Sequence, residues 1–290
     1  MDLSSLPRLG IGISTEPGSA AAGGVDAVRL AVEHPGTIDF LEYGGDLARG
    51  LDEHVRRWAG TGRPTTYHFL DLNLAERGDA DAVWTSLTRA RADQIGAAWL
   101  CGDGGLWHFG PRARGHEILA PPILTPESAD EMAEALGEAM ARLGRPVLPE
   151  NPPAVAYVGE LHVLDYFARV VSRAQAGMLL DCAHLAIFQR TRGLPALSGL
   201  DGFPLERVIE LHVAGGTPAE ADGFAWVEDS HVPELLPETR VIVEWIVPRA
   251  PALRAIVFEC EKNPVEACLP GFAWLRALWD ARAEAQGKGA

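Results

Sequence analysis

The stretch Met178-Leu179-Leu180-Asp181-Cys182-Ala183-His184 decides how this chain is interpreted. Its three leading apolar residues are typical of the end of a strand that is buried on both faces. An aspartate follows at once, and a histidine comes three residues after it. In a parallel α/β barrel the chemistry lies at the carboxyl ends of the strands, and these two side chains are common metal ligands. The stretch therefore predicts a barrel strand that ends in a metal site.

The same pattern recurs along the chain, and this recurrence carries the argument because a single Asp-x-x-His pair occurs by chance. Seven further apolar runs predict strands, and segments with helical spacing separate most of them. Besides the opening stretch, strands are expected at residues 9–14, 38–43, 64–69, 97–101, 146–151, 207–213 and 255–260. Helices are expected at about 25–32, 51–58, 81–94, 125–143, 160–174 and 272–285, with a last crossover within 234–253.

Alternating strands and helices predict a parallel sheet, and eight such units predict an α/β fold of the closed (β/α)8 TIM barrel type. No linker interrupts the pattern, so residues 1–290 are expected to form a single TIM-barrel catalytic domain with a frayed tail from about 283 to 290. The apolar run 241–246 begins only ten residues after His231, too close for a crossover helix. The last strand is therefore placed at 255–260, which favours Glu259 over Glu244 as a site residue.

The composition narrows the classes of function. The chain has 290 residues, of which 47% are hydrophobic, and this is enough for one large core. It has no apolar run of the ~20 residues that span a bilayer and no signal peptide pattern at its start. Its four cysteines are widely spaced, which predicts a reduced, cytoplasmic protein. The net charge of −15 repels a phosphate backbone and argues against nucleic acid as a partner.

Ionisable side chains gather at the expected strand ends and in the loops just beyond them. Imidazole and carboxylate groups without a thiolate pattern suit iron, manganese or zinc. One such ion holds about four to six ligands, so a larger set indicates two or three ions bridged by carboxylates. The nine candidate metal ligands are His68, His108, Glu150, Asp181, His184, His212, Asp229, His231 and Glu259.

Single members of this set also have simpler interpretations. A lone histidine at a strand end is more often a hydrogen-bonded wall residue than a ligand, and Asp229 can cap a helix. Leaving many unpaired ionisable groups buried at one rim is costly, which favours the metal interpretation for the set. The fourth strand leaves two alternatives open, because His108 lies seven residues beyond Cys101 whereas Asp103 lies two residues beyond it.

Four short motifs carry a resemblance to a known family. They are Pro149-Glu150-Asn151-Pro152, Leu179-Leu180-Asp181, Glu210-Leu211-His212-Val213-Ala214-Gly215 and Asp229-Ser230-His231. In order and spacing they resemble the multinuclear non-haem iron-dependent oxidative enzymes, the family of the methanobactin-biosynthesis oxidase and the thiaglutamate-pathway enzyme. The resemblance extends over almost the whole chain, from the first strand to Glu259.

The resemblance implies a barrel with two or three iron ions, mixed Fe(II) and Fe(III) in the active form, that uses O2. It implies as substrate a residue, often cysteine, of a ribosomally made precursor peptide, whose leader a separate partner protein presents. Glu42, Asp103 and Asn151 are expected to support the metal ligands. Trp107 is expected to contact substrate, on a loop (residues 102–122) that would cover the site.

Two other interpretations remain open. The nine-residue set also resembles the metal ligands of the endonuclease-IV and xylose-isomerase-like barrels, which implies a metal-dependent hydrolase or a sugar isomerase. A metal-binding scaffold for a peptide-modifying complex is the non-enzymatic interpretation. Activity that persists without O2 would favour the hydrolase or isomerase. Metal binding without turnover would favour the scaffold.

Overall fold

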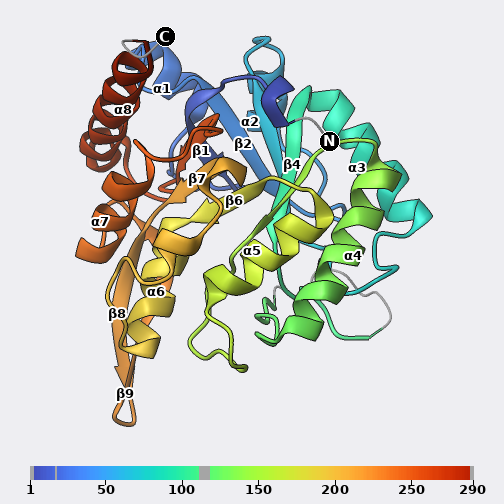
Figure 1. Cartoon of the computed structure of the whole chain (residues 1–290). Coiled ribbons are helices and arrows are strands. Elements are labelled where there is room, and N and C mark those ends of the chain that lie inside the picture. Colours follow the sequence, from blue (N-terminus) through green and yellow to red (C-terminus); the bar gives the residue numbers. More distant parts are fainter. Residues whose placement is uncertain (1–2, 17, 111–117, 288–290) are drawn as a thin grey trace.

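Eight parallel strands close into a barrel, which confirms the predicted fold (Figure 1). The computed structural model describes residues 3–16, 18–110 and 118–287. Around the barrel the strands follow the order β1-β10-β7-β6-β5-β4-β3-β2. They are β1 (Gly10–Thr15), β2 (Phe40–Gly45), β3 (Thr65–Phe69), β4 (Ala97–Asp103), β5 (Val147–Glu150), β6 (Met178–Asp181), β7 (Val208–Val213) and β10 (Ala255–Phe258).

Helices surround the barrel (Figure 1), and side-chain caps fix where several of them begin. Asp26, Asp52, Asp81 and Thr125 each accept hydrogen bonds from backbone N–H groups that the first helical turn leaves unpaired. The helices are α1 (Ala27–Glu33), α2 (Glu53–Ala59), α3 (Ala82–Ile95), α4 (Pro126–Leu143), α5 (Val163–Ala174), α6 (Cys182–Arg192), α7 (Pro237–Ile246) and α8 (Val265–Gly287). Short 3-10 turns lie at Leu3–Ser5, Leu200–Gly202 and Leu205–Arg207.

The amino-terminal half of the barrel interior is filled by large apolar side chains. They form a hydrophobic cluster of their own, separate from the core between strands and helices. Because its members come from strands all around the barrel, this cluster occupies the barrel interior. We call five of its members the apolar floor: Phe40, Trp99, Leu148, Leu179 and Val257.

Two elements were not predicted from the sequence. Helix α6 begins directly after β6, with Asp181 as its N-cap. An antiparallel hairpin of β8 (Gly215–Ala221) and β9 (Phe224–Val232) follows β7 and extends away from the barrel (Figure 1). Its tip, Asp222-Gly223, has positive φ at both residues, the requirement of a two-residue hairpin turn.

The last strand lies where it was expected, whereas the last helix is longer than expected. The apolar run 241–246 lies in α7, so placing the last strand at β10 is confirmed. The last helix begins at Val265, earlier than expected, and is still helical over residues 283–287 where fraying was expected. Residues 288–290 of that tail and residues 111–117 of the long loop lie outside the described residues. None of the described helices has both the length and the apolar character of a membrane span.

The contribution of the apolar floor to the stability of the fold can be tested by mutation. Leu148 is fully buried in it, so Leu148→Ala should lower the free energy of unfolding by about 2–5 kcal/mol through the cavity it leaves. The matched change Leu87→Ala, on the exposed face of α3, should alter stability by less than about 0.5 kcal/mol. Urea denaturation measures both, and equal losses for the two variants would contradict the assignment of Leu148 to the core.

Candidate metal centre

A layer of ionisable side chains lies directly above the apolar floor. Side chains two residues apart on a strand point to the same face, so the second residue beyond each floor residue also points into the barrel. In this way Phe40 leads to Glu42, Leu148 to Glu150, Leu179 to Asp181 and Val257 to Glu259. We call the buried groups at this level and at its mouth the ionisable layer: Glu42, His68, Asp103, Glu150, Asp181, His184, His212 and Glu259.

Glu150 lies at the centre of this layer and faces different histidines with its two oxygens. Its Oε2 is 2.7 Å from His68 Nε2. Its Oε1 is 3.4 Å from His184 Nδ1 and 3.4 Å from His212 Nδ1. Asp103 Oδ2 lies 4.0 Å from the same nitrogen of His68. A carboxylate that faces separate groups with separate oxygens has the arrangement of a bridge between two cations.

His212 connects Glu150 to the opposite part of the layer. Its Nδ1 lies 3.1 Å from Glu259 Oε1, and its Nε2 lies 2.8 Å from Glu42 Oε1. Glu42 is itself held by the hydroxyl of Thr66 at 2.9 Å and the thiol of Cys101 at 3.1 Å. Glu42 therefore holds the side of the His212 ring that carries Nε2.

The hairpin brings the Asp229-x-His231 pair to the mouth of the barrel. Asp229 Oδ2 lies 3.0 Å from His184 Nε2 and 3.3 Å from His231 Nε2. The same nitrogen of His231 is 3.8 Å from Glu259 Oε2. Asp229 and His231 thus complete the layer from outside the barrel wall.

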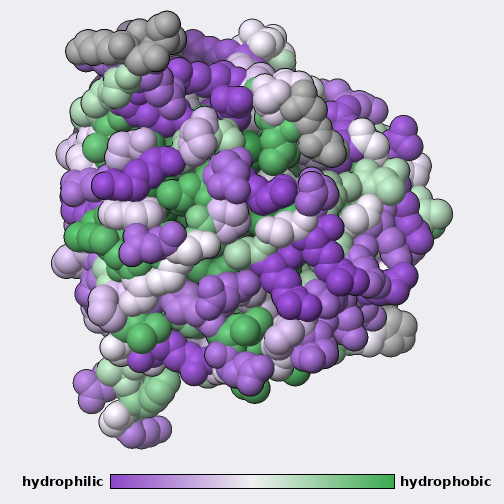
Figure 2. Space-filling view, in the orientation of Figure 1, coloured by the Kyte–Doolittle hydropathy of each residue, from purple (hydrophilic) through white to green (hydrophobic). Residues whose placement is uncertain are grey.

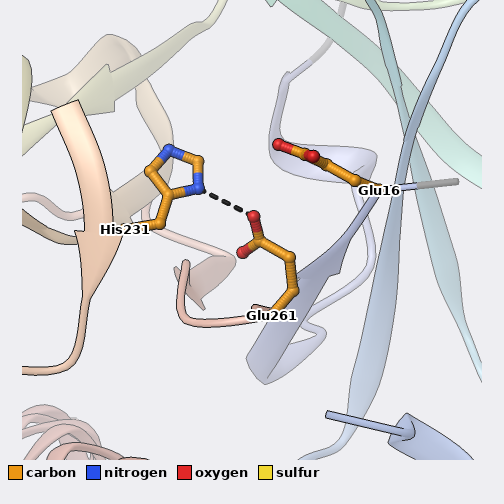
Figure 3. A group of neighbouring side chains, drawn as sticks. All are labelled: Glu16, His231 and Glu261. Carbon is orange, nitrogen blue, oxygen red and sulfur yellow. Dashed lines mark hydrogen bonds and ion pairs between the residues drawn. The ribbon is translucent and has the colours of Figure 1, made fainter. Parts of the chain in front are cut away.

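Glu261 is a member of the site that the sequence interpretation missed. Figure 3 shows Glu261 between His231 and Glu16, with its carboxylate directed at the histidine. The Nδ1–H of His231 donates to Glu261 Oε1 at 2.9 Å, and Ser14 donates to Glu261 Oε2 at 2.8 Å. A neutral imidazole has only one acceptor nitrogen, so this bond leaves Nε2, on the side of Asp229 and Glu259, as the nitrogen that can bind a metal. The signal in the sequence was its position, two residues beyond Glu259.

His231 also has an unusual backbone conformation. Its φ is +49°, a region that non-glycine residues seldom adopt. The side chain of Asn263 donates to the His231 carbonyl at 2.7 Å and holds this conformation. Backbone strain of this kind is concentrated at functional sites, where the surrounding structure maintains it.

Asn151 joins the ends of two strands and orients His184. Its side chain exchanges hydrogen bonds with the backbone of Asp181, at 2.9 and 3.0 Å. Its carbonyl accepts from His184 Nδ1 at 2.8 Å, which turns His184 Nε2 toward Asp229. Asp181 Oδ1 accepts from the backbone of His184 at 2.6 Å as the cap of α6. Its Oδ2 has no hydrogen bond and remains available in the layer.

Burial and charge together shift the pKa values of the layer. Burial lowers the pKa of the His68 imidazole, but the hydrogen bond and charge of Glu150 outweigh it and raise the pKa to about 9. Burial raises the pKa of Asp103 to about 7 and that of Asp181 to about 8. Burial also acts on Glu150, yet His212 and His68 hold its pKa below the usual range.

These shifts describe a site with more carboxylates than its histidines can neutralise. A cation that enters would displace the protons from Asp103 and Asp181, because metal ligands bind in their deprotonated form.

Unpaired buried atoms support a fit to metal ions. Several polar atoms of the layer are buried without a hydrogen bond in the described part of the chain, and burying such atoms uncompensated is costly. The donors are carboxylate oxygens and imidazole nitrogens, the set that iron, manganese and zinc prefer. The unpaired atoms are Glu150 Oε1, Asp181 Oδ2, His212 Nδ1, Asp229 Oδ1 and Glu259 Oε2.

The structure brings eight of the nine expected metal ligands together and places His108 elsewhere. His108 Nε2 lies 3.3 Å from Asp79, and its backbone is bonded to the side chain of Asn73. Asp103, the alternative for the fourth strand, lies in the layer with His68 and Glu150. We therefore carry Asp103 forward in place of His108.

A cavity of about 400 Å³ opens above the layer. Trp107 lines it, which places this residue where substrate contact was expected. Glu16 and Lys262, paired at 2.9 Å, also line the cavity, on the side of β1 and β10. The space is large enough for one amino-acid side chain and its neighbouring backbone to reach the ionisable layer.

Glu150 provides a direct test of the centre. Glu150→Gln keeps the size of the side chain but removes the charge, so the number of metal ions bound per chain should fall. The matched change Glu138→Gln on α4, where Glu138 pairs with Arg77, should leave metal content unchanged. Elemental analysis of both purified variants decides, and full metal content in Glu150→Gln would remove Glu150 from the centre.

Glu261 provides a second test, because it would hold the metal ligand His231 in position without binding the metal itself. Glu261→Leu removes the acceptor of His231 Nδ1 and should weaken metal binding about 10–100-fold. Glu261→Gln, whose amide oxygen still accepts, should restore most of the affinity. Competition with a chelator measures this, with Glu266→Leu at the exposed start of α8 as the control. Equal affinities for Glu261→Leu and the control would show that His231 needs no such support.

The fold has many relatives among solved structures. Endonuclease IV from Thermus thermophilus covers 96% of this chain and 100% of its own, with a TM-score of 0.54 and 18% identity. A xylose isomerase domain protein from Planctomyces limnophilus covers 96% and 99%, with a TM-score of 0.54 and 13% identity. At such low identity these similarities show the barrel fold alone.

Sequence relatives and a family model identify the chain more closely. A UPF0276 protein of Rhizorhabdus wittichii is 24% identical over 201 residues, which are 68% of this chain and 70% of that protein. A UPF0276 protein of Streptomyces avermitilis is 29% identical over 240 residues, 79% of this chain and 46% of that protein. Residues 31–267 match the model of the RiPP precursor modification enzymes MbnB/TglH/ChrH. The chain therefore belongs to this family of peptide-modifying enzymes, as the resemblance of its motifs implied.

Proposed function

We propose that this protein is an O2-dependent multinuclear non-haem iron enzyme that oxidatively modifies a cysteine of a ribosomally made precursor peptide. One observation carries the proposal. Three groups of potential ligands adjoin one another in the ionisable layer, and successive groups share a carboxylate, first Glu150 and then Asp181. The groups are His68 with Asp103 and Glu150, Glu150 with Asp181 and His184, and Asp181 with His212 and Glu259.

Shared carboxylates favour more than one ion over a single one. In our assignment His68, Asp103 and Glu150 would hold one ion, and Asp181, His212 and Glu259 would hold a second. His184, Asp229 and His231 would hold a third at the hairpin, and His184 also lies beside Glu150 and Asp181, the carboxylates that neighbouring groups share. The thiol of Cys101 takes no part, because burial raises its pKa well above the usual value and it donates to Glu42.

When bound, iron in these sites would supply the redox chemistry and an open position for O2. The chain's own residues bind and orient the reactants. Asn151 and Glu261 keep Nε2 of His184 and His231 facing the centre. The walls of the cavity, Trp107 among them, exclude water from the substrate residue. The precursor peptide is the substrate in this proposal, and a separate protein presents its leader.

Metal content is the measurement that tests the proposal first. Protein purified without O2 should contain two or three iron ions per chain, part ferric and part ferrous, by elemental analysis with Mössbauer or EPR spectroscopy on the same sample. Such protein should consume O2 when given its precursor peptide. If protein from iron-replete cells contains zinc or manganese but no iron, the function is instead that of a metal-dependent hydrolase or isomerase. Iron-loaded protein that consumes no O2 with the peptide would overturn the oxidative function.

A further inference from the structure

Exposed apolar side chains are concentrated on one side of the cavity mouth. Of eleven large hydrophobic side chains exposed in the described residues, five lie after β4 (residues 104–110 and 118–125) or after β5 (residues 151–162). Soluble proteins expose single apolar residues everywhere, but such a group adjoining a cavity marks a binding surface. We call the five the apolar rim: Phe109, Ile118, Ile123, Val155 and Val158, which are 43–68% exposed.

Hydrogen bonds tie the two loops into one surface. The N–H of Leu124 donates to the carbonyl of Val158 at 2.7 Å, and the N–H of Leu161 donates to the carbonyl of Leu124 at 3.0 Å. Ile123 precedes Leu124 directly, so Ile123 and Val158 lie on neighbouring strands of backbone. Figure 2 shows apolar side chains along the lower edge of the molecule, where Figure 1 places the loop that leads into α5. The backbone bonds make this part of the rim a preformed surface.

The two loops that carry the rim also contribute to the wall of the cavity. Trp107, Leu119 and Pro153 line the cavity, and they belong to the same two loops as the rim. Each lies one or two residues from a rim residue: Phe109, Ile118 and Val155, respectively. A ligand that enters the cavity from this side passes over the rim.

The other side of the mouth is charged. In the strand order β1 lies four places from β5, and β10 lies four places from β4, so these strands face each other across the barrel. Glu16 follows β1 and Lys262 follows β10, and their ion pair lines that side of the cavity. The mouth is therefore apolar on the side of β4 and β5 and polar on the side of β1 and β10.

We propose that the apolar rim binds the precursor peptide next to the residue that enters the cavity. The peptide then carries apolar side chains on one flank of that residue and polar or charged side chains on the other. This inference rests on the peptide substrate of the proposed function, but not on iron or O2. The position of the rim beside the cavity favours a ligand that also enters the cavity over a second copy of the chain.

The test uses a random library of twelve-residue peptides displayed on phage, selected on the whole protein without O2. The native protein should enrich peptides with a run of apolar residues on one side. The double variant Ile123→Asp/Val158→Asp should reduce binding of the enriched peptides about tenfold or more, because it puts charge on the rim. The matched control Val32→Asp/Val83→Asp, at exposed sites on α1 and α3, should bind them as the native protein does.

Two further readouts separate the possible outcomes. Metal content equal to the native protein in the rim variant shows that the centre is intact, so lost binding then supports the rim. Unchanged binding in the rim variant, or no enrichment of apolar peptides by the native protein, would overturn the inference. A native dimer that the rim variant abolishes in sedimentation would also overturn it, in favour of a second copy. Absence of iron with the selection intact would count against the oxidative function alone.

Discussion

The excess of carboxylates in the barrel mouth is the constraint on which the rest of the site depends. Six carboxyl groups, from Glu42, Asp103, Glu150, Asp181, Asp229 and Glu259, face four imidazoles in a largely buried space at the bottom of the cavity. Like charges buried this close are costly unless protons or cations compensate them. The raised pKa values of Asp103 and Asp181 show the compensation by protons. Metal ions are the other form of compensation.

Much of this arrangement could be predicted because a barrel strand has a period of two. Once the apolar runs are taken as strands, the residue at each carboxyl end has a known direction, so Glu150, Asp181 and Glu259 could be assigned to one layer. Parallel strands on one rim then bring residues far apart in sequence together. Glu42 could be assigned in the same way, because it lies two residues beyond Phe40.

The parts of the site that could not be predicted lie in loops and at strand ends, where side chains do not follow the two-residue alternation of a strand. His108 is in a long loop, and only the tertiary structure shows that it packs against Asp79 and Asn73 instead of His68. The hairpin has a turn signal in Asp222-Gly223, but its first strand, β8, is short of apolar residues and resembles a loop in sequence. Glu261 lies just beyond the expected strand 255–260, so only its spacing of two residues from Glu259 indicated its direction.

The hairpin has a consequence for how firmly the centre is held. Asp229 and His231 are 17% and 19% exposed and come from a two-stranded element, whereas Glu150 and Asp181 are at most 2% exposed and come from barrel strands. Local opening of a hairpin costs far less than opening a closed barrel. An ion at the hairpin would therefore exchange with solvent while the ions below it stay in place. The centre would have a permanent part and a replaceable part, and changes in the hairpin sequence could retune the second without disturbing the first.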